Sequence, residues 1–430
     1  MSGETGMRAS LLRLIVRVVG IALVIVLAGS LALRLHGRKR LAVAEGEFRR
    51  AASQFDADAC RSVNVPDAEN ASIWLRAGAD ALVLSQADKV LMADLASLPV
   101  ARWTPEQKAA LNRLADGNAP GIELLARGAG LKRSSYGLNG TESDEERKVA
   151  LPLLPLINSA RLLQPAARLA LAEGKVDRFL ELAGAIAAVA ASTEREAPLT
   201  SLLIGSAAEK IMLTAVADAV ADPTLDDAAL ARLEEILVDV DLRTAWRRSV
   251  VCNRRAVDTR VGDAAVAGDV WPGLLRVVLG ASLWDAPYVE VQARLLSAFD
   301  EPYGLGRTGE SVRNIRIWPL GPQMLFMVPN LVNAAGRCQV VASERRLASL
   351  AIRLRRQALR SGSYPASLLG VAGGEGPDPF SGRNLSYELR PDGSARLAVP
   401  GGEVLWDKLN PTIHFPGPFT WELPALNPSR

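Results

Sequence analysis

Three pairs of neighbouring carboxylates are the residues of this chain best suited to acid–base chemistry: Asp56/Asp58, Glu234/Glu235 and Asp239/Asp241. Hydrolysis of a glycosidic bond uses two carboxyl groups in one cleft, one of them protonated. The sequence places none of the three pairs in a cleft, and solvated helix faces or helix caps explain them all. We therefore assign no catalytic residue and keep a carboxylate-dependent hydrolase as an alternative.

Metal and cofactor motifs are the second source of chemistry. The only histidines are His36 and His414, which excludes multi-histidine metal sites and the HExxH motif. No GxSxG nucleophile turn and no GxxxxGK phosphate loop occurs. Residues 304–309 (GLGRTG) match GxGxxG, but the acidic residue that should follow about 20 positions later is missing. We expect a loop there and predict no metal site and no cofactor.

The three cysteines are Cys60, Cys252 and Cys338. They are too far apart for a CxxC zinc or redox motif. One disulfide with a leftover thiol is possible, but the sequence does not say which two residues would pair, and it does not decide the compartment.

Composition predicts a helical protein that does not bind nucleic acid. Hydrophobic residues make up 49% of the chain but aromatic residues only 5%, so Ala, Leu and Val dominate, as in closely packed helices. The net charge is +3, yet residues 1–40 hold seven basic residues and one acidic residue, so the remaining chain is slightly acidic. Five tryptophans could line a groove but are more simply explained as core anchors: Trp103, Trp246, Trp271, Trp284 and Trp318.

Residues 18–33 (VVGIALVIVLAGSLAL, hereafter the apolar segment) contain no charge. With their flanks they reach the roughly 20 residues that cross a bilayer. A signal peptide cleaved near Ala28-Gly-Ser30 is one interpretation. We favour an anchor, with residues 11–35 in a bacterial inner membrane, because no Pro or turn residue separates the segment from the helix that follows. Basic residues flank both ends almost equally, and the signal-like layout favours an extracytoplasmic body.

The body, residues 41–339, reads as an irregular stack of α-hairpins. Thr104-Pro-Glu-Gln107 is a capping box, and residues 167–191 predict two helices joined by Glu173-Gly174-Lys175, similar to one tetratricopeptide unit. Helices at about 197–221 and 225–261 predict a second hairpin. Residues 317–336 are uncharged, but their prolines and asparagines favour a buried kinked segment over a second span.

The C-terminal region, residues 340–430, predicts a helix followed by a small β-hairpin. Residues 340–360 form a basic amphipathic helix whose arginines either contact anionic lipid or an acidic partner, or form a solvated face. Strands at 384–389 and 395–399 flank Pro391-Asp392-Gly393, a turn sequence. Between helix and strands lie GxYPxSL (residues 362–368) and DPFSG (residues 378–382).

This C-terminal pattern resembles the tail of uncharacterised membrane-anchored bacterial proteins. It is also similar to the region that follows the long helix of type II secretion pseudopilins. The resemblance implies placement in the envelope and brings no activity with it. The sequence as a whole therefore favours a mainly α protein with residues 1–40 as anchor, acting as a non-catalytic scaffold for a protein partner. The alternatives are the hydrolase and a secretion or pilus accessory.

Overall fold

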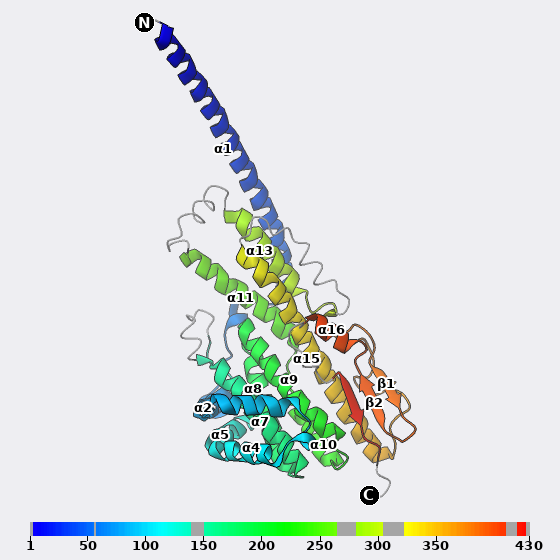
Figure 1. Ribbon diagram of the computed structural model, residues 1–430. Helices are drawn as coiled ribbons and strands as arrows, with labels where there is room; N and C mark the ends of the chain where they lie inside the picture. Colours follow the sequence, from blue (N-terminus) through cyan, green and yellow to red (C-terminus); the bar gives the residue numbers. More distant parts are fainter. Residues whose placement is uncertain are drawn as a thin grey trace.

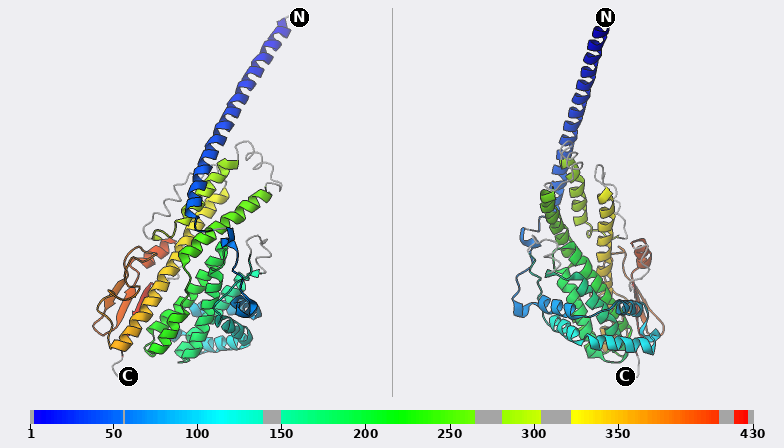
Figure 2. Two further views of the ribbon diagram at one scale, coloured as in Figure 1. Left: turned by 180° about the vertical axis from the view of Figure 1, so that it is seen from behind. Right: turned by 60° about the vertical axis from the view of Figure 1, so that its left-hand side comes forward.

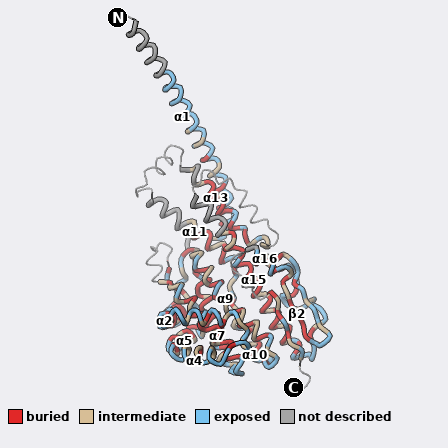
Figure 3. Tube along the Cα trace, in the orientation of Figure 1, coloured by how far each residue is buried: buried red, intermediate tan, exposed pale blue. Residues whose placement is uncertain are grey.

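A single helix, α1 (Gly3–Ala51), leads from the N-terminus into the body of the protein (Figure 1). The computed structural model describes residues 3–55, 57–138, 150–264, 281–303, 322–409 and 419–426. Side chains along the apolar segment are exposed, for example Val24 at 64% and Ile25 at 65% (Figure 3). The helix from Arg17 to Ala51 has a mean hydropathy of 2.5 in its most apolar window, so it is apolar enough to span a membrane, as predicted.

The lower part of α1 is joined firmly to the body. Ala44 and Phe48 are buried in the main core, and α1 packs along α13 (Ala281–Leu296). The guanidinium of Arg40 donates to both carboxylate oxygens of Glu290, at 2.5 and 2.7 Å. Because this ion pair is bidentate, it fixes orientation as well as distance between the two helices.

The first helices of the body form a small layer beside the central helices (Figure 2). After the short helices η1 (Ala57–Cys60) and η2 (Asp67–Glu69) come α2 (Ala71–Ala81), α3 (Gln86–Ser97), η3 (Val100–Arg102), α4 (Pro105–Gly117) and α5 (Ala119–Ala129). The predicted capping box is confirmed: Thr104 Oγ1 accepts from the Gln107 amide, and Gln107 Oε1 from the Thr104 amide. Helices α2 and α5 approach so closely that a Cβ on Gly78 would lie 2.7 Å from the Gly121 carbonyl oxygen.

The predicted hairpin is also confirmed, as α7 (Leu153–Ala172) and α8 (Val176–Glu194). Gly174 turns the chain at φ +73°, and the Lys175 amide donates to the Ala170 carbonyl at 2.8 Å, closing the end of α7. The expected apolar stripe of α8 is buried, including Phe179 and Ile186. The hairpin forms because two apolar faces meet across one left-handed glycine.

The single helix expected over residues 225–261 is a wrong prediction. The structure has α9 (Leu199–Ala221), then two helices, α10 (Asp227–Ile236) and α11 (Leu242–Ala264). Asp226 caps α10 by accepting from the Ala229 amide at 2.8 Å, and Asp241 accepts from the Arg243 amide at the start of α11. Each helix thus has its own acidic cap, which breaks the continuous helix that periodicity alone suggested.

Helix α15 (Pro322–Ser361) runs through the body and carries the C-terminal region (Figure 1). It packs against α9, α10, α11 and α13, and the boundary expected between residues 339 and 340 falls inside it. Residues 322–336 of the uncharged segment belong to this helix, with Val332, Ala334 and Ala335 buried; residues 317–321 lie outside the described part of the chain.

The predicted β-hairpin is present and is part of a three-stranded antiparallel sheet. β1 (Ser386–Leu389) pairs with β2 (Ala395–Ala398), and after α16 (Gly402–Leu409) an unpredicted strand, β3 (Thr420–Leu423), adds to β2. Asp378 of the DPFSG motif is buried and accepts from the amides of Phe380 and Ser381 and from the Ser343 hydroxyl of α15. The DPFSG motif therefore builds a turn bound to α15, while the GxYPxSL motif contacts the sheet, since the Tyr387 hydroxyl donates to the Pro365 carbonyl.

A disulfide links Cys60, in the segment after α1, to Cys252 of α11, with 5.4 Å between their Cα atoms. Cys338 is a free, buried thiol on α15. The bond ties the segment that follows α1 to α11.

Candidate functional site

Three acidic side chains lie in the core where α8, α9 and α15 meet. Glu194 is the last residue of α8, Glu209 lies in the middle of α9 and Glu344 on α15. The side chains of all three are 0% exposed. Burial of a carboxylate is costly unless it is paired, so this cluster is the strongest electrostatic feature of the described core.

Arg345 of α15 is the cation at the centre of this cluster. Its guanidinium contacts both carboxylate oxygens of Glu209 at 2.5 Å and one oxygen of Glu194 at 3.4 Å. A third N–H donates to the carbonyl of Val240, in the segment between α10 and α11. One side chain therefore connects α8, α9 and the segment between α10 and α11 to α15.

Burial favours the protonated form of Glu194. Burial, then the neighbouring charge of Glu209, raises its pKa well above the ordinary value, and the charge of Arg345 only partly opposes this. Glu194 Oε1 has no hydrogen-bond partner among the described residues, and protonation lowers the cost of burying it. Beside it, Glu209 and Arg345 form a buried ion pair.

A second buried pair lies next to the first. The Lys210 ammonium contacts Glu344 Oε1 at 2.9 Å and lies 4.0 Å from the ring centroid of Trp406, on α16. Burial raises the pKa of Glu344, and the charge of Lys210 acts in the opposite direction. Three consecutive residues of α15 thus make three separate connections. Ser343 binds the DPFSG turn, Glu344 binds α9, and Arg345 binds Glu194 and Glu209.

Two carboxyl groups of which one is protonated are what acid–base hydrolysis requires. Hydrolysis also needs access for substrate and water, and the side chains of Glu194 and Glu209 are fully enclosed. The backbone of Gly205 closes one side, because a Cβ there would lie 2.5 Å from Glu194 Cγ. As folded, the cluster can hold helices in register but cannot receive a substrate.

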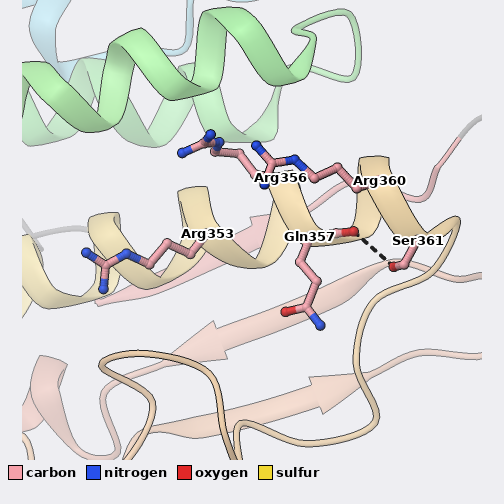
Figure 4. A pocket seen from close by; sticks show the side chains of 5 residues that line it. All are labelled: Arg353, Arg356, Gln357, Arg360 and Ser361. Atoms are coloured by element: carbon pink, nitrogen blue, oxygen red, sulfur yellow. Dashed lines mark hydrogen bonds between the residues drawn. The ribbon is translucent and has the colours of Figure 1, made fainter.

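A surface pocket of about 360 Å³ lies elsewhere, on the last turns of α15 (Figure 4). It is lined by Arg353, Arg356, Gln357, Arg360 and Ser361. Its arginines are engaged by two acids of α10: Arg356 bridges Asp227 at 2.9 Å and Glu234 at 2.6 Å, while Arg353 binds Glu234 and Arg360 binds Asp227.

The electrostatics of this pocket follow from those pairs. Partial burial acts to raise the pKa of Glu234, but hydrogen bonds from Arg353 and Arg356 outweigh it, so the pKa lies below its ordinary value. Arg346 donates to backbone carbonyls of residues 373–377. Arg345 is also paired within the chain. The arginines on the basic face of α15 therefore bind groups of the same chain, and these contacts account for them without lipid or an acidic partner.

The carboxylate pairs singled out from the sequence do not come together as a site. Glu234 is held by arginines, Glu235 is exposed, and Asp241 serves the start of α11 while Asp239 is exposed. The side chains of Asp56 and Asp58 lie outside the described part of the chain.

The other candidate residues have structural positions where they are described. Trp103 and Trp246 are buried and donate their indole N–H groups to the carbonyls of Leu98 and Leu295, as core anchors do. His36 is exposed on α1. The described part of the chain does not include His414, Trp271, Trp318, the side chain of Trp284 or residues 304–309.

Sequence reasoning missed the buried charged residues that matter most here. Glu209 interrupts the apolar run of α9, and a charge in such a run is a signal that could have been used. Arg355 was likewise missed: it is buried and donates to the carbonyls of Ala219, Val220 and Leu225, which caps the end of α9.

Comparison with protein-family models, with curated proteins and with solved structures finds no match for this chain.

Proposed function

We propose that this chain is a membrane-anchored scaffold of the bacterial envelope whose body lies outside the cytoplasm and binds a protein partner. The observation that carries the proposal is the direct connection between α1, with its exposed apolar segment, and a body cross-linked by the Cys60–Cys252 disulfide. Structural disulfides persist in oxidising compartments, which supports an extracytoplasmic body.

The rigid attachment of the body supports a scaffold. Arg40–Glu290 fixes α1 to α13, and the disulfide fixes the next segment to α11. A partner held by this body would therefore be kept at a defined distance and orientation from the membrane. In the proposal the α-hairpins, including the tetratricopeptide-like α7–α8, supply the binding surface.

The arrangement of charges favours binding over catalysis. Glu194, Glu209 and Glu344 are enclosed, and Asp227 and Glu234 are held by arginines. The hydrolase remains the second candidate because Glu194, whose pKa is raised, and Glu209 contact the same guanidinium. It requires α8, α9 and α15 to separate, and it predicts that Glu209→Gln abolishes function in a protein that still folds.

A secretion or pilus accessory is the remaining alternative. It rests on the GxYPxSL and DPFSG pattern, whose residues dock the sheet on α15. Removing residues 340–430 would also remove about half of α15. Deleting residues 386–430, which contain the C-terminal sheet, is therefore the cleaner test. Unchanged assembly in that variant would count against the alternative.

The scaffold proposal is tested by photo-crosslinking from a genetically encoded benzophenone in living cells. Val83 in the helical layer and Leu369 near the C-terminal sheet are each 80% exposed, and Ile25 in the apolar segment serves as the control for membrane neighbours. We expect a discrete protein adduct from Val83 or Leu369 that Ile25 does not give, and the same partner after gentle-detergent purification. Absence of any discrete adduct from both body positions, with a partner-free purified protein, would contradict the scaffold.

A further inference from the structure

The body covers part of α1 at the level of the membrane. Along the apolar segment all side chains are exposed except Ser30 and Leu33, which are partly covered. The same face of the helix continues through Gly37, Ala44 and Phe48, which are buried. Spacings of three and four residues place these positions on one stripe, so the surface that receives the body begins inside the apolar segment.

The element packed along this stripe is α13. Glu290, near its middle, holds Arg40 of α1. The far end of α13 points into the body, because the Leu295 carbonyl accepts from the indole of Trp246 on α11. Helix α13 therefore runs in the same direction as α1, and its first residues lie on the side of the N-terminal part of α1 (Figure 1).

Helix geometry gives the depth of that end. At about 1.5 Å per residue, Ala281 lies roughly 14 Å closer to the membrane than Glu290. This places it beside residues 31–35 of α1. A bilayer core about 30 Å thick needs roughly 20 apolar residues, so the whole apolar segment must lie within it.

We infer that the N-terminal end of α13 enters the interface of the bilayer beside α1, so that the body sits on the membrane rather than hanging from a tether. The partner of this surface is the lipid bilayer itself, at the boundary between headgroups and acyl chains. The inference rests on the proposed anchoring of the chain through α1.

The test compares the two ends of α13 in the full chain reconstituted into phospholipid nanodiscs. Ser282→Cys places a nitroxide label in the first turn of α13, and Ser297→Cys places one just after its last turn. The Cys60–Cys252 disulfide stays intact, and Cys338→Ser removes the free thiol from every variant. Accessibility to molecular oxygen and to a water-soluble nickel chelate is then measured by power saturation. Ile25→Cys in the apolar segment is the lipid reference.

We expect the label at position 282 to be several-fold less accessible to the nickel chelate than the label at 297, and to fall between 297 and 25 in oxygen accessibility. Equal, water-like accessibility at 282 and 297, with a lipid-like label at 25, would overturn the inference and leave the anchoring intact. A water-like label at 25 would instead overturn the anchoring on which it rests.

Discussion

Arg345 of α15 and Glu209 of α9, 136 residues apart in the chain, form a bidentate ion pair inside the core, and Glu194 of α8 contacts the same guanidinium. Three helices thus meet at one guanidinium. Removing one partner of a buried pair leaves an uncompensated charge, whereas replacing the whole group can be neutral. This relationship determines how the helical core should respond to pH and to substitution.

Glu194→Gln should remove a pH dependence of stability. Because the folded-state pKa of Glu194 is raised, its contribution is fully present below the pKa of an unfolded glutamate and is lost as pH rises through the folded pKa. Glutamine imitates the protonated acid, so the variant should lose less stability than the wild type on going to alkaline pH. Urea denaturation of the detergent-solubilised chain from pH 5 to 9 measures this. Glu235→Gln, which changes an exposed acid, is the control, and parallel wild-type and Glu194→Gln profiles would contradict the raised pKa of Glu194.

Arg345→Met should destabilise the protein strongly, by about 3–5 kcal/mol, because Glu209 would be left buried without a cation. Adding Glu209→Gln should recover part of the loss. Arg232→Met is the matched control, since Arg232 pairs with Asp177 at the surface and should cost about 1 kcal/mol or less. The denaturant midpoints of the wild type, the two single arginine variants and the double variant measure these losses of stability. Equal effects of the two arginine substitutions would show that the buried pair is not structural.

Replacing both Cys60 and Cys252 by Ser should lower stability by about 2–5 kcal/mol, since the bond closes a long loop with a sequence separation of 192. Reduction of the wild-type protein should have the same effect. Cys338→Ser, which removes the buried thiol, is the control and should not change the sensitivity to reductant. A thermal transition that is identical with and without reductant would exclude the disulfide from the native protein.

Gly205→Ala should cost about 1–3 kcal/mol, because the new Cβ would lie 2.5 Å from Glu194 Cγ and force the acid cluster apart. Gly184→Ala, also within a helix, should be neutral or stabilising, since the nearest atom to its Cβ would be 4.0 Å away. Thermal denaturation of the two variants provides the comparison. A tolerated Ala at 205 would mean that the packing around Glu194 is looser than the structure has it.

The features that could be predicted from the sequence are those set by neighbouring residues. The Thr104 capping box, the Gly174 turn between α7 and α8 and the β1–β2 hairpin each depend on a few adjacent residues, and each was found where expected. The apolar segment was equally clear because sixteen uncharged residues leave little choice of environment.

Features that depend on residues far apart could not be predicted. Nothing local pairs Cys60 with Cys252 or Arg345 with Glu209, because those contacts exist only after the helices pack. Strand β3 pairs with the edge of β2 although α16 lies between them in the chain, so no turn sequence of the kind that joins β1 to β2 indicates it. The two described carboxylate pairs that were chosen for their adjacency, Glu234/Glu235 and Asp239/Asp241, contain no buried acid.

Topology tests the central claim, a body held outside the cytoplasm by α1, most directly. Two reporters fused after Arg430, one active only outside the cytoplasm and the other only inside, measure it in living cells. Activity of the external reporter is the predicted result and fits the Cys60–Cys252 disulfide. Activity of the internal reporter alone would contradict the claim and leave a helical scaffold tethered to the cytoplasmic face of the membrane.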